Sequence, residues 1–227
     1  MKQQPLMRSV STAATVTERV LVSFSGGKDS VVALDLAMNH FKHVDIFFMY
    51  LAGDLSFQSS LIRYYEDKYG QPIIRVPHFM LSEWLRYGTY RDMDFDVPIV
   101  SVKQVYDYVR ELTGTWWIAG GERIADSIWR RAMIKQSGSI DAKRGRFYPL
   151  ADWSKADVLA YIRQRRLRVG LESTKLGFSF RSLMAADMIK IKEFFPGDFE
   201  TIKRWFPLVE TGIKHHEFFK NQTGPAA

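Results

Sequence analysis

One segment constrains the fold more than any other: an apolar run passes through a glycine pair directly into a helical pattern. Residues 19–25 (RVLVSFS) are β-branched and apolar, which is typical of a buried strand. After Gly26 and Gly27, residues 28–40 place apolar side chains at helical spacing. A strand that turns at once into a helix is the unit of open α/β sheets, so this segment predicts that fold class.

The same alternation continues along the chain. Further buried strands are expected at residues 44–51, 72–76 and 115–119. The patterns between and after them predict helices at residues 57–69, 82–87 and 100–112. Because strands and helices alternate, the sheet should be doubly wound and mainly parallel, with helices on both faces.

The two ends of the chain follow other patterns. Residues 1–17 are polar and rich in small side chains, and they predict a flexible tail before an α/β domain at residues 18–166. Residues 167–220 show helical patterns punctuated by proline and glycine, which predict a helical C-terminal lobe. Residues 221–227 are expected to form a loose end.

The turn after the first strand has the chemistry of a phosphate site. Gly26 and Gly27 allow the backbone to approach a ligand without a Cβ clash. The helix that follows presents unpaired N–H groups and the positive end of its dipole to an anion. The candidate binding side chains around the glycines are hydroxyls and one cation: Ser23, Ser25, Lys28 and Ser30.

Asp29 adds a carboxylate to this turn, which is unexpected in a site for anions. The carboxylate is explained if it orients Mg²⁺ or an amide of the loop. Mg²⁺ is therefore a candidate cofactor with Asp29 as its candidate ligand, and the contact with a loop amide stays the alternative.

The spacing of the two glycines differs from that of a Walker loop. Residues 25–30 (SGGKDS) instead resemble the PP-loop of the ATP pyrophosphatase superfamily. The resemblance implies an adenine nucleotide α-hydrolase-like fold. It also implies that the loop holds the pyrophosphate end of ATP while a nucleophile attacks the α-phosphorus.

Two further motifs narrow the resemblance. Residues 121–130 (GERIADSIWR) are similar to the G-x-R-x-x-acid-S-x-x-R pattern of the adenylyl-sulfate branch, which includes phosphoadenosine-phosphosulfate reductases and the small catalytic subunit of bacterial ATP sulfurylase. Residues 147–162 resemble a packing segment of the same branch. The resemblance places Gly121, Arg123 and Arg130 at the site, with the two arginines suited to oxyanions.

A weaker match follows the second strand. Ala52, Gly53 and Asp54 stand where members of this branch carry a turn that touches the adenosine. The resemblance therefore implies that Asp54 lies near the nucleotide.

The chain contains no cysteine. Thiolate metal sites, iron–sulfur clusters and cysteine nucleophiles are excluded for that reason. The reductases that the chain resembles finish catalysis with a cysteine, so thiol-dependent reduction of a sulfonucleotide is not available here. ATP binding, attack at the α-phosphorus and pyrophosphate release remain.

We therefore expect an enzyme that cleaves ATP at the α–β bond and adenylylates an acceptor such as sulfate or a similar oxyanion. Sulfate adenylation of this type in bacteria is driven by a GTPase, which would have to be a partner protein.

Two alternatives to this reaction stay open. One is adenylation of a nucleic acid in a modification pathway, favoured by the net charge of +7 and the arginines of residues 163–168. The other is a non-catalytic nucleotide-binding subunit.

The sequence contains no uninterrupted apolar stretch of the roughly 18 residues that a transmembrane helix requires. We therefore expect no membrane partner and a cytoplasmic location.

Overall fold

A six-stranded sheet forms the centre of the molecule, with strand order β3-β2-β1-β4-β6-β5. The computed structural model describes residues 3–177 and 179–222. Its strands are β1 (Arg19–Ser23), β2 (His43–Tyr50), β3 (Ile73–Pro77), β4 (Ile118–Ala119), β5 (Ile140–Asp141) and β6 (Arg146–Phe147). All neighbouring strands are parallel except β5 with β6, which confirms the predicted α/β class and mainly parallel sheet.

The central strand β1 lies between β2 and β4, where the strand order reverses. Open α/β sheets bind ligands beyond the carboxyl ends of their strands at such a switch point. The turn after β1 therefore occupies the position where this architecture places a ligand.

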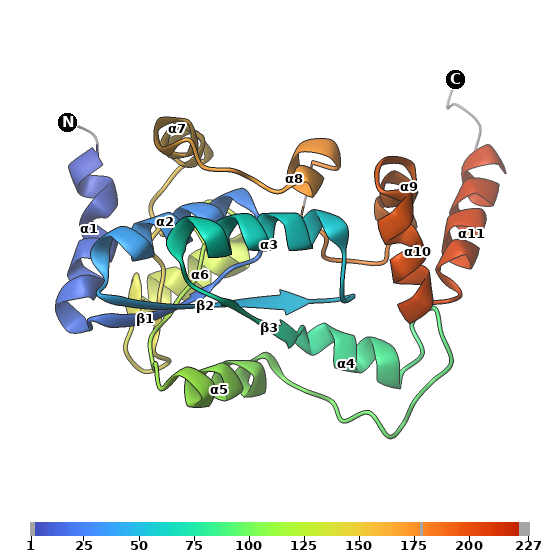
Figure 1. Cartoon of the computed structure of the whole chain (residues 1–227), viewed down its shortest axis with the longest axis horizontal. Helices are drawn as coiled ribbons and strands as arrows, with labels where there is room; N and C mark the ends of the chain where they lie inside the picture. Colours follow the sequence, from blue (N-terminus) through green and yellow to red (C-terminus); the bar gives the residue numbers. More distant parts are fainter. Residues whose placement is uncertain (1–2, 178, 223–227) are drawn as a thin grey trace.

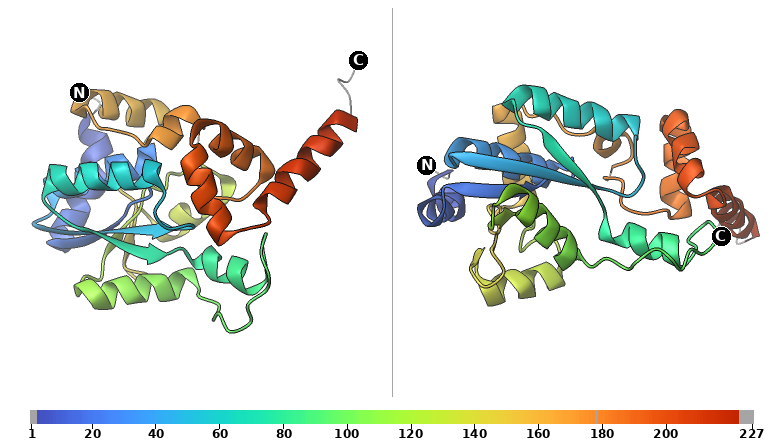
Figure 2. Two further views of the ribbon diagram at one scale, coloured as in Figure 1. Left: turned by 45° about the vertical axis from the view of Figure 1, so that its right-hand side comes forward. Right: turned by 60° about the horizontal axis from the view of Figure 1, so that its bottom comes forward.

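Helices cover both faces of the sheet (Figures 1 and 2). On one face lie α2 (Lys28–His40), α3 (Ser56–Tyr69) and α7 (Lys155–Arg165). Alternate residues of a strand point to opposite faces, and Val20 and Val22 of β1 belong to the core under these helices. Leu21, between them, belongs to a smaller core on the other face with Val105 and Val109 of α5 (Val102–Thr113).

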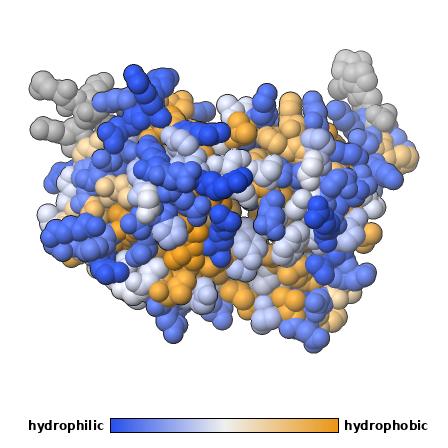
Figure 3. Space-filling view, viewed as in Figure 1, coloured by the Kyte–Doolittle hydropathy of each residue, from blue (hydrophilic) through white to orange (hydrophobic). Residues whose placement is uncertain are grey.

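Strand β3 is an edge strand, and α4 (Phe79–Arg86) follows it directly. Hydrophobic side chains gather near the middle of the face in Figure 3, between α3 and α5 where β3 runs.

Helix α6 (Ile128–Ser137) lies beyond β4 and packs through Ile134 and Met133 against Tyr148 and Ala151.

The first helix corrects the expectation of a flexible tail at residues 1–17. Residues Gln3–Val16 form α1, which packs against α2. Val10 and Ala13 are buried, and they lie three residues apart on one side of the helix. Two small or medium apolar residues are too weak a pattern to stand out in a polar segment, which explains the wrong prediction.

The C-terminal lobe contains α8 (Leu171–Lys175), α9 (Ala185–Phe194), α10 (Pro196–Trp205) and α11 (Val209–Gln222). It has its own apolar cluster, which includes Leu55 and Phe57 of the sheet domain. Asp198 of α10 accepts hydrogen bonds from the backbone N–H groups of Ser56 and Phe57 and from the Ser56 hydroxyl. Because these groups begin α3, the lobe is fixed at the carboxyl edge of the sheet.

The proposed division after residue 166 falls at the end of α7, where Arg166 adopts a left-handed conformation. Residues 221 and 222, expected in a loose end, belong to α11, and residues 223–227 lie outside the described residues. Across residues 3–177 and 179–222, no helix is both long and apolar enough to cross a bilayer.

Candidate nucleotide site

The turn from β1 into α2 forms the centre of the candidate site. Gly26 has φ of +74°, a left-handed conformation that glycine adopts without strain. Gly27 is the N-cap residue of α2, and as a glycine it has no side chain that could cap the helix. The first N–H groups of α2 are therefore available to an anion, which the helix dipole also favours.

Two serines hold the shape of this turn. The buried Ser30 hydroxyl accepts from the backbone N–H and the hydroxyl of Ser25, both at 3.1 Å, and donates to the Gly27 carbonyl at 2.9 Å. Ser25 is exposed at the turn, and Ser23 is half-buried at the end of β1. Ser30 thus acts on the conformation of the loop, which sequence reasoning described only as hydrogen bonding to a ligand.

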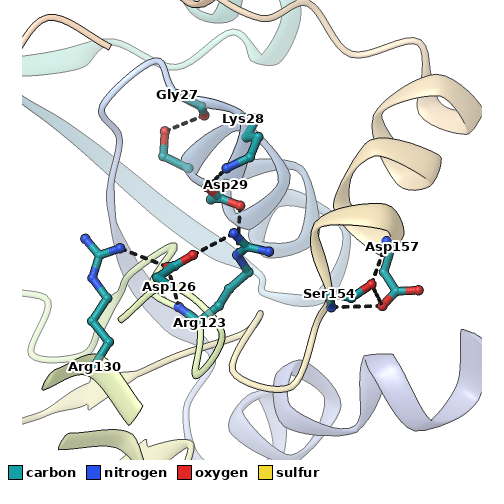
Figure 4. Close-up of polar contacts among 9 residues, drawn as sticks. Gly27, Lys28, Asp29, Arg123, Asp126, Arg130, Ser154 and Asp157 are labelled. Carbon is teal, nitrogen blue, oxygen red and sulfur yellow. Dashed lines mark hydrogen bonds and ion pairs between the residues drawn. The ribbon is translucent and has the colours of Figure 1, made fainter. Parts of the chain in front are cut away.

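A chain of alternating charges leads from the loop to α6 (Figure 4). Lys28 donates to the carboxylate of Asp29. Asp29 Oδ1 lies 3.1 Å from Arg123 Nε, and Arg123 Nη2 donates to Asp126 at 2.6 Å. Asp126 also accepts from Arg130 Nη1 at 2.8 Å. The structure therefore brings together Lys28, Asp29, Arg123 and Arg130, and it adds Asp126, the acid of the second motif, as the link between the two arginines.

Arg123 keeps donor capacity despite these two carboxylates. The residue is only 5% exposed, and its Nη1 and Nε have no hydrogen-bond partner among the described residues. The contact of Nε with Asp29 is close enough for an ion pair but is not aligned as a hydrogen bond. A buried unpaired donor costs stability, so its presence beside the phosphate loop points to an anionic ligand.

Gly121 explains how the second motif approaches the loop. A Cβ built at Gly121 would lie 2.9 Å from Ser30 N and 3.0 Å from the carbonyl carbon of Asp29. These are rigid backbone atoms at the start of α2, so a larger residue would push the two segments apart. Gly121 therefore sets the distance between the loop and Arg123, whereas sequence reasoning had placed it against the nucleotide.

Glu122, the neighbour of Gly121 in the motif, contacts the sheet. It accepts a hydrogen bond of 2.7 Å from Arg146 on β6. Burial opposes the charge of Arg146, but Glu122 and the phenolic oxygens of Tyr106 and Tyr148 outweigh it and raise the pKa of Arg146. This pair fixes the strand end that carries the second motif.

Asp54 lies in the turn after β2 and is exposed, with φ of +61°. Its carboxylate forms no hydrogen bond or ion pair within the described part of the chain. A Cβ on the adjacent Gly53 would contact the Trp205 ring at 3.4 Å, so this turn packs on the C-terminal lobe. Its proximity to a nucleotide remains a prediction.

A segment of the C-terminal lobe covers the loop, which sequence reasoning missed. A Cβ on Gly27 would lie 2.8 Å from Ser179 Oγ, and one on Gly26 would lie 3.5 Å from Glu172 Oε1. Glu172 is 1% exposed, its Oε2 has no partner among the described residues, and burial raises its pKa to about 7. A contact across about 145 residues leaves no periodic signal in a single sequence.

Among the residues that the structure describes, the carboxylates do not form a metal cage. No group of three or more His, Cys, Asp or Glu side chains in the described ranges is placed to hold a metal ion. Mg²⁺ commonly binds through one or two carboxylates together with substrate phosphates. Asp29 Oδ1 is buried and accepts no hydrogen bond, so Asp29 could serve as the single carboxylate ligand in such a site.

Comparison with known proteins decides the family. Residues 19–170, more than half of the chain, match the phosphoadenosine phosphosulfate reductase domain. The chain belongs to this family. As a phosphoadenosine phosphosulfate (PAPS) reductase-domain protein it is a member of the PP-loop superfamily, and this confirms the resemblance drawn from the loop and the two motifs. Among curated proteins, none matches this PAPS reductase-domain chain.

Solved structures support the fold of the PAPS reductase-domain chain. The PAPS reductase of Candida auris, in a phosphate complex, has 18% identity and a TM-score of 0.52, covering 78% of this chain and 86% of that one. The NH3-dependent NAD synthetase of Campylobacter jejuni, in complex with nitrate, has 14% identity and a TM-score of 0.51, covering 94% and 96%.

A third structure is the U34-tRNA thiolase NcsA of Methanococcus maripaludis with its [4Fe-4S] cluster, at 15% identity and a TM-score of 0.48, covering 91% and 80%. At their identities, the likeness to the PAPS reductase and to the NAD synthetase concerns the fold alone. The family membership supports an enzyme that uses ATP, at the level of the PP-loop superfamily.

Proposed function

We propose that this chain cleaves ATP between the α- and β-phosphates and transfers the adenylyl group to an acceptor, with release of pyrophosphate. The observation that carries the proposal is the buried, unpaired Nη1 of Arg123, held beside the phosphate loop through Asp29. The absence of cysteine supports this chemistry over thiol-dependent reduction.

The loop supplies the binding part of the reaction. The free N–H groups at the start of α2 and the ammonium of Lys28 would hold the β- and γ-phosphates. Lys28 is paired with Asp29 in the structure. When the phosphates bind, its ammonium would exchange the Asp29 carboxylate for a phosphate oxygen. Bound Mg²⁺, with Asp29 as its protein ligand, would neutralise part of the pyrophosphate charge.

Arg123 supplies charge stabilisation that is specific to the transition state. An acceptor oxygen attacks the α-phosphorus, the bond to the bridging oxygen breaks, and both electrons of that bond leave with pyrophosphate. Negative charge shifts on the phosphoryl oxygens during this step, and a preorganised guanidinium stabilises it at little cost because its position is already fixed. Asp126 orients Arg123, and Arg130 reaches the site through Asp126.

An anionic acceptor needs no general base, because its oxygen is already deprotonated. Sulfate or a similar oxyanion therefore fits the site as described, and the pair of arginines suits it. A nucleic-acid acceptor is the second candidate, and it is favoured by the exposed Trp129 and the basic side chains of α6.

The test is incubation of the protein with Mg²⁺ and ATP labelled at the α-phosphate, with and without sulfate, related oxyanions and oligonucleotides. The proposal predicts stoichiometric pyrophosphate and a labelled product larger than AMP with one acceptor class. Release of γ-phosphate without pyrophosphate would contradict it. ATP binding without any cleavage across the panel would favour a non-catalytic nucleotide-binding subunit.

A further inference from the structure

Two apolar side chains on α6 stand out of the protein surface. Ile128 is 83% exposed and Trp129 is 87% exposed, more than any other large hydrophobic residue that the structure describes. Single exposed apolar residues are common, but exposing a whole indole beside a second apolar side chain has a cost in water. An adjacent pair of this kind marks a contact surface.

The exposed face of α6 also carries basic side chains. Arg131 and Lys135 lie three and seven residues after Ile128, which places all three on one side of the helix. The helix contains no acidic residue, and within the described residues neither Arg131 nor Lys135 forms an ion pair. Its opposite side is buried through Ile134 against Tyr148.

This surface begins directly beside the candidate nucleotide site. The helix starts one residue after its N-cap Ser127, and Asp126 before it holds both Arg123 and Arg130. A molecule lying along α6 therefore has one end at the guanidinium that we assign to the α-phosphate.

We propose that the α6 surface, consisting of Ile128, Trp129, Arg131 and Lys135, binds single-stranded nucleic acid. An exposed indole offers a face on which a base stacks, and the two cations on the Ile128 side of the same helix would contact the phosphate backbone of the strand. A strand of this chemistry satisfies both features of the surface, whereas a small oxyanion uses only the charges. That the bound strand is also the adenylyl acceptor rests on the function proposed above.

The test is fluorescence anisotropy with labelled single-stranded RNA and DNA oligonucleotides of about twelve nucleotides, at several salt concentrations. Trp129→Ala removes the stacking platform and should weaken binding about tenfold or more. Arg131→Glu should weaken it as well and reduce the dependence of the logarithm of affinity on the logarithm of salt concentration by roughly one unit or more.

Two matched controls separate the surface from general effects. Trp116→Ala removes an indole that is 52% exposed and stacked on Arg110 of α5. Lys155→Glu makes a similar change of charge at an exposed position of α7. Both should bind the oligonucleotides like the parent.

Equal affinity of the parent and the two α6 variants would overturn the proposal. Competition by poly-glutamate at equal charge, as strong as by the oligonucleotide, would also overturn it, because it would reduce the surface to a general patch for polyanions. Lys28→Ala should retain oligonucleotide binding. If the parent binds the oligonucleotides but releases no pyrophosphate, the proposed function is contradicted and the proposed binding surface is not.

Discussion

Two aspartates on the same helix show how one element serves the site and the fold at once. Asp29 lies in the first turn of α2, is 23% exposed, and pairs with Lys28 and Arg123, with one oxygen left without a hydrogen bond. Asp35, six residues later, is 1% exposed and accepts hydrogen bonds from Tyr69, Tyr161 and Arg165. The first carboxylate is incompletely satisfied beside a ligand site, and the second is saturated between three helices.

The difference teaches where each carboxylate acts. Burial alone would raise the pKa of Asp35, but the hydrogen bonds from Arg165, Tyr69 and Tyr161 outweigh it and hold the pKa below its ordinary value. Its partners come from α3 and α7, so Asp35 joins these two helices to α2. Asp29 connects the loop to the second motif. We therefore expect loss of stability from changes at Asp35 and loss of turnover from changes at Asp29.

The largest effect should come from removing the saturated carboxylate. Asp35→Ala leaves the hydroxyls of Tyr69 and Tyr161 without their partner and should destabilise the fold by about 2–4 kcal/mol, because each buried donor left unpaired costs about 1–3 kcal/mol. Thermal and urea unfolding measure this. Asp29→Asn is the matched control and should change the midpoint by no more than about 2 °C while abolishing pyrophosphate release.

The pH dependence of the parent sharpens the same comparison. Because the pKa of Asp35 is lowered on folding, the stability that it contributes is present above its unfolded pKa of about 4 and is lost as pH falls. Asp35→Asn should therefore flatten the acid limb of the stability curve. An unchanged acid limb would mean that Asp35 does not join the helices as described.

The next effect concerns Arg123. Arg123→Ala should lower the rate of pyrophosphate release about 10²–10³-fold and change ATP affinity much less, because its contact with the phosphate strengthens in the transition state. Arg123→Lys should recover little, since an ammonium lacks the planar fork that meets two carboxylates. Single-turnover rates and ATP titrations on both variants provide the measurement. Parent-like rates in both would reduce the second motif to a structural feature.

A smaller effect is expected from the carboxyl that covers the loop. The pKa of Glu172 is raised to about 7 by burial, so the folded protein binds its proton more tightly than the unfolded chain. The resulting stability is present at pH 5 and is lost as pH rises toward 7, by up to about 3 kcal/mol. Glu172→Gln should therefore raise the midpoint at pH 8 and change little at pH 5. The same gain at both pH values would contradict the assigned titration.

The sequence predicted the elements with strong periodicity and missed the short or irregular ones. Strands β1, β2 and β3 and helices α2, α3 and α5 follow the predicted ranges within a few residues, because each has a clear apolar pattern. The fourth strand was expected at residues 115–119 but contains only Ile118–Ala119. The strands β5 and β6 have two residues each and carry no periodic signal.

In the site, too, local patterns were predicted from the sequence and contacts between distant segments were not. Local motifs led to the loop and to Arg123, because glycine pairs and charged turns are visible in one sequence. The pairing of Arg123 with Asp29, the narrow space at Gly121 and the cover by Glu172 depend on contacts between distant segments. Such contacts become visible only when the sheet brings the segments together.

The central claim is that the turn after β1 holds the pyrophosphate end of ATP. The most direct measurement is pyrophosphate release from ATP and Mg²⁺ by the parent and by Lys28→Ala, alongside the shift of the thermal midpoint by ATP and by GTP. We predict release by the parent, none by Lys28→Ala with its unfolding midpoint unchanged, and a larger shift with ATP than with GTP. Normal pyrophosphate release by Lys28→Ala would contradict the account.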